Sequence, residues 1–356
     1  MSILFAILLF SILIFVHELG HFVAAKLSGV QVNEFALFMG PAIWKKQVGE
    51  TLYALRCIPL GGYCAMEGED GGSDNPRSFD KAAWWKRFII LVAGATMNFV
   101  AGLALLGICY APAEAFVTPV ISIVEEGCSL AEGDGIQVGD RLVKLDGERI
   151  YVSSDFETIL AIRGGTTHDI VVERSGEKVL LEDVLLERRQ FADGQRYGFS
   201  FTLVEATFSE KVSYVWNTAL DTMRLVRLSL QMLVTGQAGL QDMSGPVGIV
   251  QIMSETAEAS ETRLDALLNM IYFGGFLAIN LAVMNLLPIP ALDGGRVVGL
   301  LVTTAVEKVT GRKINPKYEG YLHGAGMILL LGLMAIIMFK DTLRLPLEWS
   351  LRSHRI

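Results

Sequence analysis

The chain of 356 residues is 52% hydrophobic and 19% charged, and its mean hydropathy is +0.44. Soluble globular domains are less apolar, so the composition indicates a protein that resides in a lipid bilayer. The net charge of −8, without a clustered basic face, argues against nucleic acid as a partner. The four cysteines lack CxxC spacing, and we expect them to be unpaired packing residues.

Four apolar stretches predict membrane helices, at residues 3–25, 88–111, 267–287 and 322–339. Such stretches can cross a hydrocarbon core of about 30 Å. A cleaved signal peptide is the alternative for the first stretch, but no basic residue precedes it. Four spans place both termini on the same side of the membrane.

Lysine and arginine predict the orientation, because short cytoplasmic loops are rich in these residues. They are frequent in the loop at residues 26–87 and in the loop after the third span. We therefore expect both loops in the cytoplasm and residues 112–206 on the outer side of a plasma membrane. The basic C-terminal tail opposes this orientation.

The region after the second span has the pattern of a small β-rich module. Short strands are predicted at residues 120–124, 141–145, 168–173 and 178–181, with one helix at 154–162. Residues 209–234 have helical apolar spacing and suit a helix on the membrane surface, with a soluble amphipathic helix as the alternative. The expected domains are residues 1–111, 112–206, 207–262 and 263–356.

The first span contains the motif His17-Glu18-Leu19-Gly20-His21. Histidines four residues apart on a helix can bind one metal ion, and the glutamate beside them can hold a water, as in the HExxH zinc motif. His17 lies roughly 21 Å along the helix, at membrane depth. Ionisable groups are costly there, so the motif indicates function rather than packing.

A catalytic zinc site needs a third protein ligand, and the best candidate is Asp293. It follows the third span in the segment Asn285-Leu286-Leu287-Pro288-Ile289-Pro290-Ala291-Leu292-Asp293-Gly294-Gly295. The prolines and glycines suit backbone that bends around a functional cavity at membrane depth. A simple helix-ending turn at the membrane surface is the alternative.

Together, HELGH and NLLPIPALDGG resemble the bacterial site-2 proteases, which are intramembrane zinc metalloproteases. Three further segments are similar to segments of that family: IPLGGY at 58–63, AGATMNF at 93–99 and GPVGI at 245–249. Residues 132–142 and 145–147 resemble part of a PDZ domain. The fold class expected is a polytopic α-helical membrane protein with four transmembrane helices, a membrane-associated β region and one inserted PDZ-like domain.

The resemblance implies that His17, His21 and Asp293 bind Zn²⁺ and that Glu18 is the general base. It also implies that Asn285 and Pro288 engage substrate, with helix capping as the alternative. The implied substrates are single-span membrane proteins, such as anti-sigma factors or remnant signal peptides.

An unwound substrate can be held by strand addition, and a sheet edge formed by residues 51–58 and 32–38 is the expected site. A plain cytoplasmic hairpin is the alternative for these residues. The PDZ-like domain could bind a peptide terminus or exclude substrates with bulky outer domains.

Two other functions fit parts of the pattern. A non-catalytic membrane adaptor would use the PDZ-like domain to recruit partners, but a structural zinc site has four protein ligands and no use for Glu18. A metal transporter would need acidic or histidine residues throughout its spans, whereas His323 is an isolated extra that we interpret as an interface residue.

Overall fold

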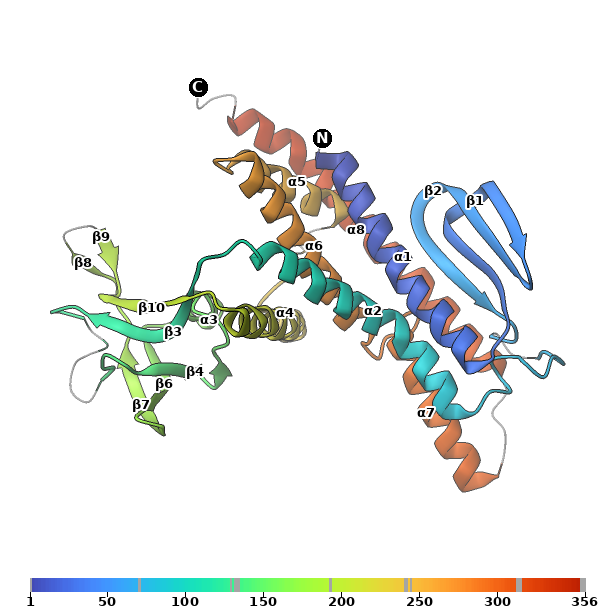
Figure 1. The fold of residues 1–356 in the computed structure, drawn as a ribbon, viewed down its shortest axis with the longest axis horizontal. Coiled ribbons are helices and arrows are strands. Elements are labelled where there is room, and N and C mark those ends of the chain that lie inside the picture. The colour runs from blue at the N-terminus through green and yellow to red at the C-terminus, as the bar shows by residue number, and fades with distance from the viewer. Residues whose placement is uncertain are drawn as a thin grey trace. The chain divides into compact units, whose positions relative to one another are not determined.

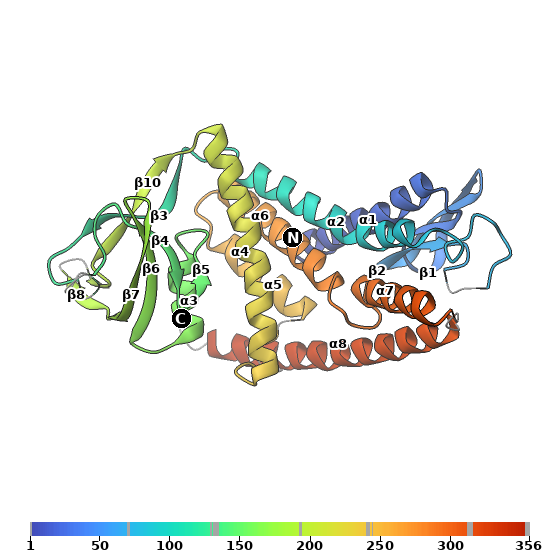
Figure 2. The ribbon, with the colours of Figure 1, turned by 90° about the horizontal axis from the view of Figure 1, so that it is seen from below.

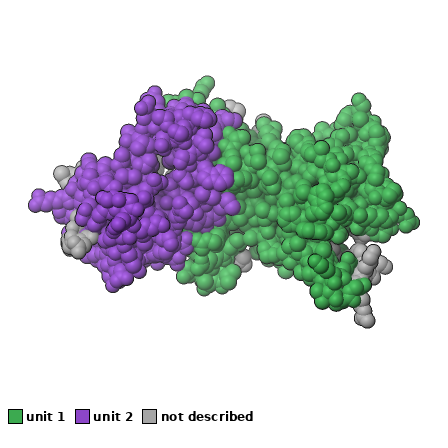
Figure 3. Space-filling model, turned by 60° about the horizontal axis from the view of Figure 1, so that its bottom comes forward, with its two compact units in different colours: residues 1–106, 226–356 green, residues 107–225 purple. Residues whose placement is uncertain are grey.

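The computed structural model describes residues 2–69, 72–128, 130, 135–191, 194–239, 243, 245–311 and 316–352. The chain forms two compact units, residues 1–106 with 226–356 and residues 107–225 (Figure 3). The first unit contains both the HExxH motif and Asp293. The second unit contains most of the strands.

The helices of the first unit include the candidate membrane spans (Figure 1). They are α1 (Ser2–Ser28), α2 (Trp84–Tyr110), α5 (Pro246–Glu258), α6 (Arg263–Asn285), α7 (Asp293–Thr310) and α8 (Pro316–Arg352). Within the described residues, four segments are long and apolar enough to cross a membrane: residues 5–28, 84–110, 263–285 and 320–342. This confirms the four predicted spans. Helices α5 and α7 were not predicted.

Small residues allow close packing of the spans. A Cβ added at Gly20 of α1 would lie 2.5 Å from the carbonyl oxygen of Ala93 on α2, and one at Gly102 of α2 would lie 2.5 Å from Ile279 of α6. Membrane helices associate through such contacts because lipid supplies no hydrophobic drive. Helices α1 and α2 therefore run side by side, as both ribbon views show (Figures 1 and 2).

Strands β1 (Val32–Val48) and β2 (Thr51–Met66) bend and pair into a small sheet beside α1 (Figure 1). The backbone bends at Gly40 and Gly61, which have φ values of 82° and 73°, a region that favours glycine. Residues 52–55 pair with residues 44–47 and also with residues 34–37, which in turn pair with residues 62–65.

Residues 51–58 and 32–38 lie in strands, but the prediction that they form the sheet edge is wrong for residues 52–55 and 34–37. Residues 52–55 have a partner on each side, so they lie inside the sheet. The edges are residues 42–48 and residues 61–66. The error has a physical cause, because each long strand bends back on the sheet and strand propensity does not report such non-local pairing.

The second unit is built on one larger sheet. Its elements are β3 (Ala115–Val124), β4 (Arg141–Leu145), β5 (Glu148–Arg149), α3 (Asp155–Arg163), β6 (Thr167–Arg174), β7 (Glu177–Leu185), β8 (Arg189–Phe191), β9 (Gly194–Arg196) and β10 (Phe199–Glu205). The strand order is β10-β3-β4-β6-β7, with β5 beside β4. Phe156 and Ile159 of α3 are buried in its core with Leu142 and Ile170. The predicted strands and helix are confirmed.

Part of the PDZ-like motif, residues 132–134, lies outside the described residues. Within the described part, Asp140 is buried and accepts a hydrogen bond from the backbone N–H of Gln137 at 2.8 Å. The Arg174 guanidinium lies 2.7 Å from the same carboxylate. Assignment of this unit to the PDZ fold remains a prediction.

Helix α4 (Phe208–Thr235) confirms the helix predicted at residues 209–234. Its N-terminal half packs on the second unit, where the Tyr214 ring stacks on Phe116 with centroids 4.2 Å apart. Further along, the Arg224 guanidinium lies 3.1 Å from the Asp155 carboxylate. Within the described part of the chain, the four cysteines form no disulfide.

Candidate active site

The interior of one helix and the beginning of another bring the predicted metal ligands together. His17 and His21 lie one turn apart on α1, with their Nε2 atoms 3.3 Å apart. The Oδ2 atom of Asp293, at the start of α7, lies 3.2 Å from each of these nitrogens. One atom from each residue thus lies within 4.8 Å of the other two.

This donor set fits Zn²⁺. Among the described residues, Asp293 Oδ2 is a buried atom without a hydrogen-bond partner. A carboxylate oxygen that faces two imidazole nitrogens places electron-rich atoms against one another unless a cation lies among them. Two histidines and one carboxylate leave the fourth position of a tetrahedral zinc open, which is the pattern of a catalytic rather than a structural site.

The imidazole of His21 is oriented by helix α2. Its Nδ1 atom lies 2.8 Å from the carbonyl oxygen of Ile90. A carbonyl can only accept, so Nδ1 carries the proton and donates it. In this tautomer the Nε2 atom keeps its lone pair and can bind a metal, as in histidines that ligate metals through Nε2.

His17 is flanked by two asparagines. The side-chain nitrogens of Asn98 and Asn285 lie 3.5 Å and 3.4 Å from His17 Nδ1. A His17 that binds metal through Nε2 carries its proton on Nδ1 and needs an acceptor there. The buried Oδ1 of Asn98, which has no partner among the described residues, supplies that acceptor if the amide turns by 180°.

Asn98 and Gly94 were quoted above only as parts of a family-like segment, without a role at the metal. A Cβ added at Gly94 would overlap His21 Nε2 and would lie 2.8 Å from His17 Cε1. Glycine is therefore required where α2 crosses the two histidines. The signal for Asn98 was a polar amide within an apolar span, because such residues are expensive in lipid.

The turn between α6 and α7 places Asp293. Added Cβ atoms at Gly294 and Gly295 would overlap the carbonyl oxygens of Leu286 and Ile289. The glycine pair thus lets α7 begin directly against the end of α6. Pro288, predicted to engage substrate, is exposed in this turn, whereas Asn285 lies beside His17.

Glu18 lies between the metal ligands and the sheet. It is partly buried, and a Cβ added at Gly62 of β2 would lie 3.2 Å from Glu18 Cγ and 3.1 Å from Ile14 Cγ2. The sheet edge at residues 61–66 therefore passes directly beside this glutamate. The edge near the predicted base is this segment and not residues 51–58.

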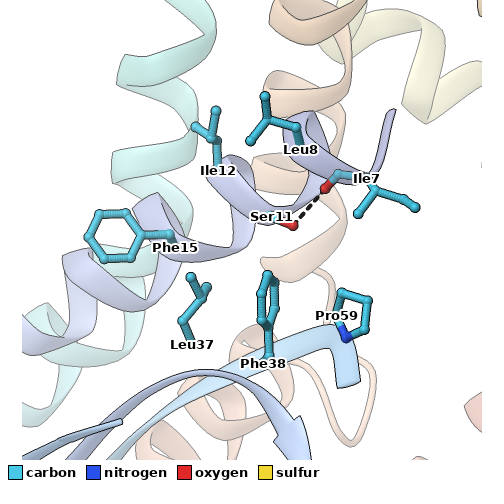
Figure 4. Close-up of a pocket in the computed structure, with 8 residues that line it drawn as sticks. All are labelled: Ile7, Leu8, Ser11, Ile12, Phe15, Leu37, Phe38 and Pro59. Atoms are coloured by element: carbon cyan, nitrogen blue, oxygen red, sulfur yellow. Dashed lines mark hydrogen bonds between the residues drawn. The ribbon is translucent and has the colours of Figure 1, made fainter. Parts of the chain in front are cut away.

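An apolar groove of about 390 Å³ separates α1 from the sheet (Figure 4). Its lining residues are Ile7, Leu8, Ser11, Ile12, Phe15, Leu37, Phe38 and Pro59. Helical spacing puts Ile7, Ser11 and Glu18 on one face of α1. The face of α1 that borders the groove therefore leads to Glu18.

The comparisons with known proteins agree with this geometry. A model described as Peptidase family M50 matches residues 5–333. "Putative zinc metalloprotease CPE1693" of Clostridium perfringens is 37% identical over 346 residues, which cover 96% of this chain and 98% of that protein. "Regulator of sigma-W protease RasP" of Bacillus subtilis is 26% identical over 427 residues, which cover 95% of this chain and 97% of that protein. The chain therefore belongs to peptidase family M50, the site-2 protease family that its motifs resemble, and is a membrane zinc metalloprotease.

Proposed function

We propose that this protein is an endopeptidase that cleaves the transmembrane segments of single-span membrane proteins. The observation that carries the proposal is that the ligand atoms of His17, His21 and Asp293 converge within a unit that contains four candidate membrane spans. Glu18 lies beside these residues and beside a sheet edge. The relative from Bacillus subtilis is named a regulator of sigma-W. That name favours anti-sigma factors as substrates, and remnant signal peptides would present the same chemistry.

In the proposed mechanism, the two histidines and Asp293 would hold zinc, which when bound would lower the pKa of a water and polarise the scissile carbonyl. Glu18 acts as the general base that takes a proton from the water as its oxygen bonds to the scissile carbonyl carbon, and returns that proton to the amine nitrogen as the carbon–nitrogen bond breaks. The Ile90 carbonyl keeps His21 in its ligating tautomer. Asn98 and Asn285 orient His17 from the other side.

The groove and the sheet edge support a path for the substrate. The groove is lined almost entirely by apolar side chains, which suits a segment that leaves lipid. A helix hides its carbonyls in its own hydrogen bonds, so the segment must unwind before it can be cleaved. Residues 61–66 could then pair with it by strand addition next to Glu18.

The proposed orientation places the active site toward the cytoplasm and the second unit outside the cell. It rests on the basic residues of the loops at 26–87 and after α6. In this arrangement the PDZ-like unit meets the outer part of a substrate. It would bind a peptide terminus there or exclude a bulky outer domain.

Helix α4 supports the proposed contact with the membrane surface. Val212, Trp216, Met223 and Val234 share one face and are all exposed, while Thr218 on another face is buried. Aromatic and aliphatic side chains on an exposed helix face suit the boundary between headgroups and acyl chains. We therefore keep the membrane-surface placement for α4.

The proposal is tested by closing the groove. Ser11→Phe should fill it and abolish cleavage of a tagged single-span substrate in liposomes while zinc content stays at the wild-type level. Leu27→Phe is the matched control, because Leu27 on the same helix is 85% exposed. Wild-type cleavage by Ser11→Phe would contradict the proposed path, and cleavage of soluble peptides alone would contradict the proposed substrate class.

A further inference from the structure

Helix α8 contacts the turn that carries Asp293. The backbone N–H of Ala291 donates a hydrogen bond to Nδ1 of His323, at 3.0 Å. Ala291 lies two residues before Asp293, whereas His323 lies in the fourth candidate span, between residues 320 and 342. The contact therefore joins an intramembrane histidine to the segment between α6 and α7.

The turn needs a contact from outside to hold its conformation, because its backbone is strained and forms few hydrogen bonds of its own. Ala291 has a φ of 79°, a region that side-chain-bearing residues rarely adopt. Pro288 and Pro290 on either side of Ile289 have no N–H to donate. Within the turn, the N–H of Ile289 bonds to the carbonyl of Leu287 and that of Leu292 bonds to the carbonyl of Ile289. Neither bond involves the N–H of Ala291, which donates its hydrogen bond to His323 instead.

We propose that His323 is a positioning residue that holds Asp293 in place for zinc by fixing the conformation of Ala291. The contact also sets the tautomer of His323. Because Nδ1 accepts, the imidazole carries its proton on Nε2. Groups that hold metal ligands in place without binding the metal themselves strongly affect metal affinity, because they fix the orientation of the ligands. The inference rests on the proposed roles of His17, His21 and Asp293.

A second contact on α8 supports the same inference. A Cβ added at Gly326 would lie 2.6 Å from Cβ of Pro290 and 2.7 Å from its carbonyl oxygen. The backbone of α8 therefore lies directly against the turn, one helical turn beyond His323. Gly324, two residues earlier, has no atom within 4 Å of such a Cβ. The close approach is thus specific to the face that carries His323.

His323 does not join the metal ligands themselves. Among the described residues, the group whose ligand atoms converge is His17, His21 and Asp293. The lone pair on Nδ1 of His323 accepts a hydrogen bond from the backbone N–H of Ala291, so this atom cannot bind a metal ion at the same time. Its proposed role is therefore to act through Ala291.

The test compares His323→Leu, which removes the acceptor, with His323→Asn, whose side-chain oxygen can replace Nδ1. Purified full-length protein loaded with zinc is challenged with a chelator, and the rate of zinc loss is measured. We expect about tenfold faster loss for His323→Leu and a rate near wild type for His323→Asn. Gly326→Ala should also accelerate zinc loss, whereas Gly324→Ala should not.

Each outcome bears on the inference. Wild-type zinc retention by His323→Leu, or equal loss by the leucine and asparagine variants, would overturn it. Zinc lost equally from Gly326→Ala and Gly324→Ala would show that α8 acts only as a general packing element. Failure of the proposed ligand roles is distinguishable, because Asp293→Ala would then leave zinc binding unchanged.

Discussion

The substitution Gly94→Ala adds one methyl group at the place where α2 crosses His17 and His21, the proposed metal ligands. That methyl would overlap His21 Nε2 and would lie 2.8 Å from His17 Cε1. Real Cβ atoms do not approach this closely, so either the helices separate or the imidazoles rotate. Because the Nδ1 of His21 is bound to the carbonyl of Ile90, rotation would also break that hydrogen bond.

The expected loss of zinc affinity follows from the free-energy cost of overpacking. Inserting a methylene into a packed site costs about 1–3 kcal/mol. If this cost falls on the zinc-loaded state, zinc affinity should drop about 10- to 100-fold, because 1.4 kcal/mol is a factor of ten. In an open helix the same substitution is favourable by up to about 1 kcal/mol, because alanine has the higher helix propensity.

Two glycines on α2 provide matched controls. Gly107 has no atom within 4 Å of an added Cβ, so Gly107→Ala should leave zinc binding unchanged and stability unchanged or higher. Gly102→Ala would press on Ile279 of α6, so it should lower stability without a direct contact to the histidines. The measurements are zinc content, zinc affinity by chelator competition and the unfolding temperature in detergent.

The reasoning would be refuted if Gly94→Ala bound zinc with wild-type affinity. It would also be refuted if Gly94→Ala and Gly102→Ala lost zinc only in proportion to their loss of stability. In that case the added methyl group would act on helix packing and not on the ligands.

Two further predictions concern acidic residues, Asp221, which is partly buried, and Asp341, which is buried. Burial, and then the Asp155 carboxylate, raises the pKa of Asp221 to about 7 against the opposing effect of Arg224. Because the folded state then holds this proton more tightly than the unfolded state, the free energy of unfolding should fall as the pH rises from 3.8 to about 7. Asp221→Asn should remove this pH dependence, as measured by hydrogen-exchange protection in α3 and α4. Asp341 accepts hydrogen bonds from the N–H groups of Gly245 and Gly248 at the start of α5, at 2.8 Å and 3.2 Å. Asp341→Ala should lower the free energy of unfolding by about 2 kcal/mol, whereas Asp341→Asn, which keeps an acceptor, should lose less.

The membrane helices and the strands of the second unit were predictable because their signals are local. Span length follows from hydropathy, and alternation of apolar residues marks strands such as β4 and β6. The position of α7 was not predictable in this way. Its first residues are Asp293 and two glycines, which have low helix propensity, and the helix begins there because the glycines fit against the end of α6.

The candidate ligands could be chosen from the sequence, but their support could not. His17 and His21 share a helix face by spacing alone, and Asp293 was singled out by the broken backbone around it. The contacts of Asn98 and His323 join residues far apart in the chain, which neither periodicity nor composition reports. The same limit applies to the sheet, where residues 61–66, and not residues 51–58, form the edge beside Glu18.

The central claim is that Glu18 performs proton transfer at a zinc site within the membrane. The most direct measurement compares cleavage of a tagged single-span substrate by the wild-type protein and by Glu18→Gln, with zinc content determined for both. Cleavage lost while zinc stays near one ion per chain is the result that this mechanism predicts. Unchanged cleavage by a Glu18→Gln protein that retains its zinc would contradict it.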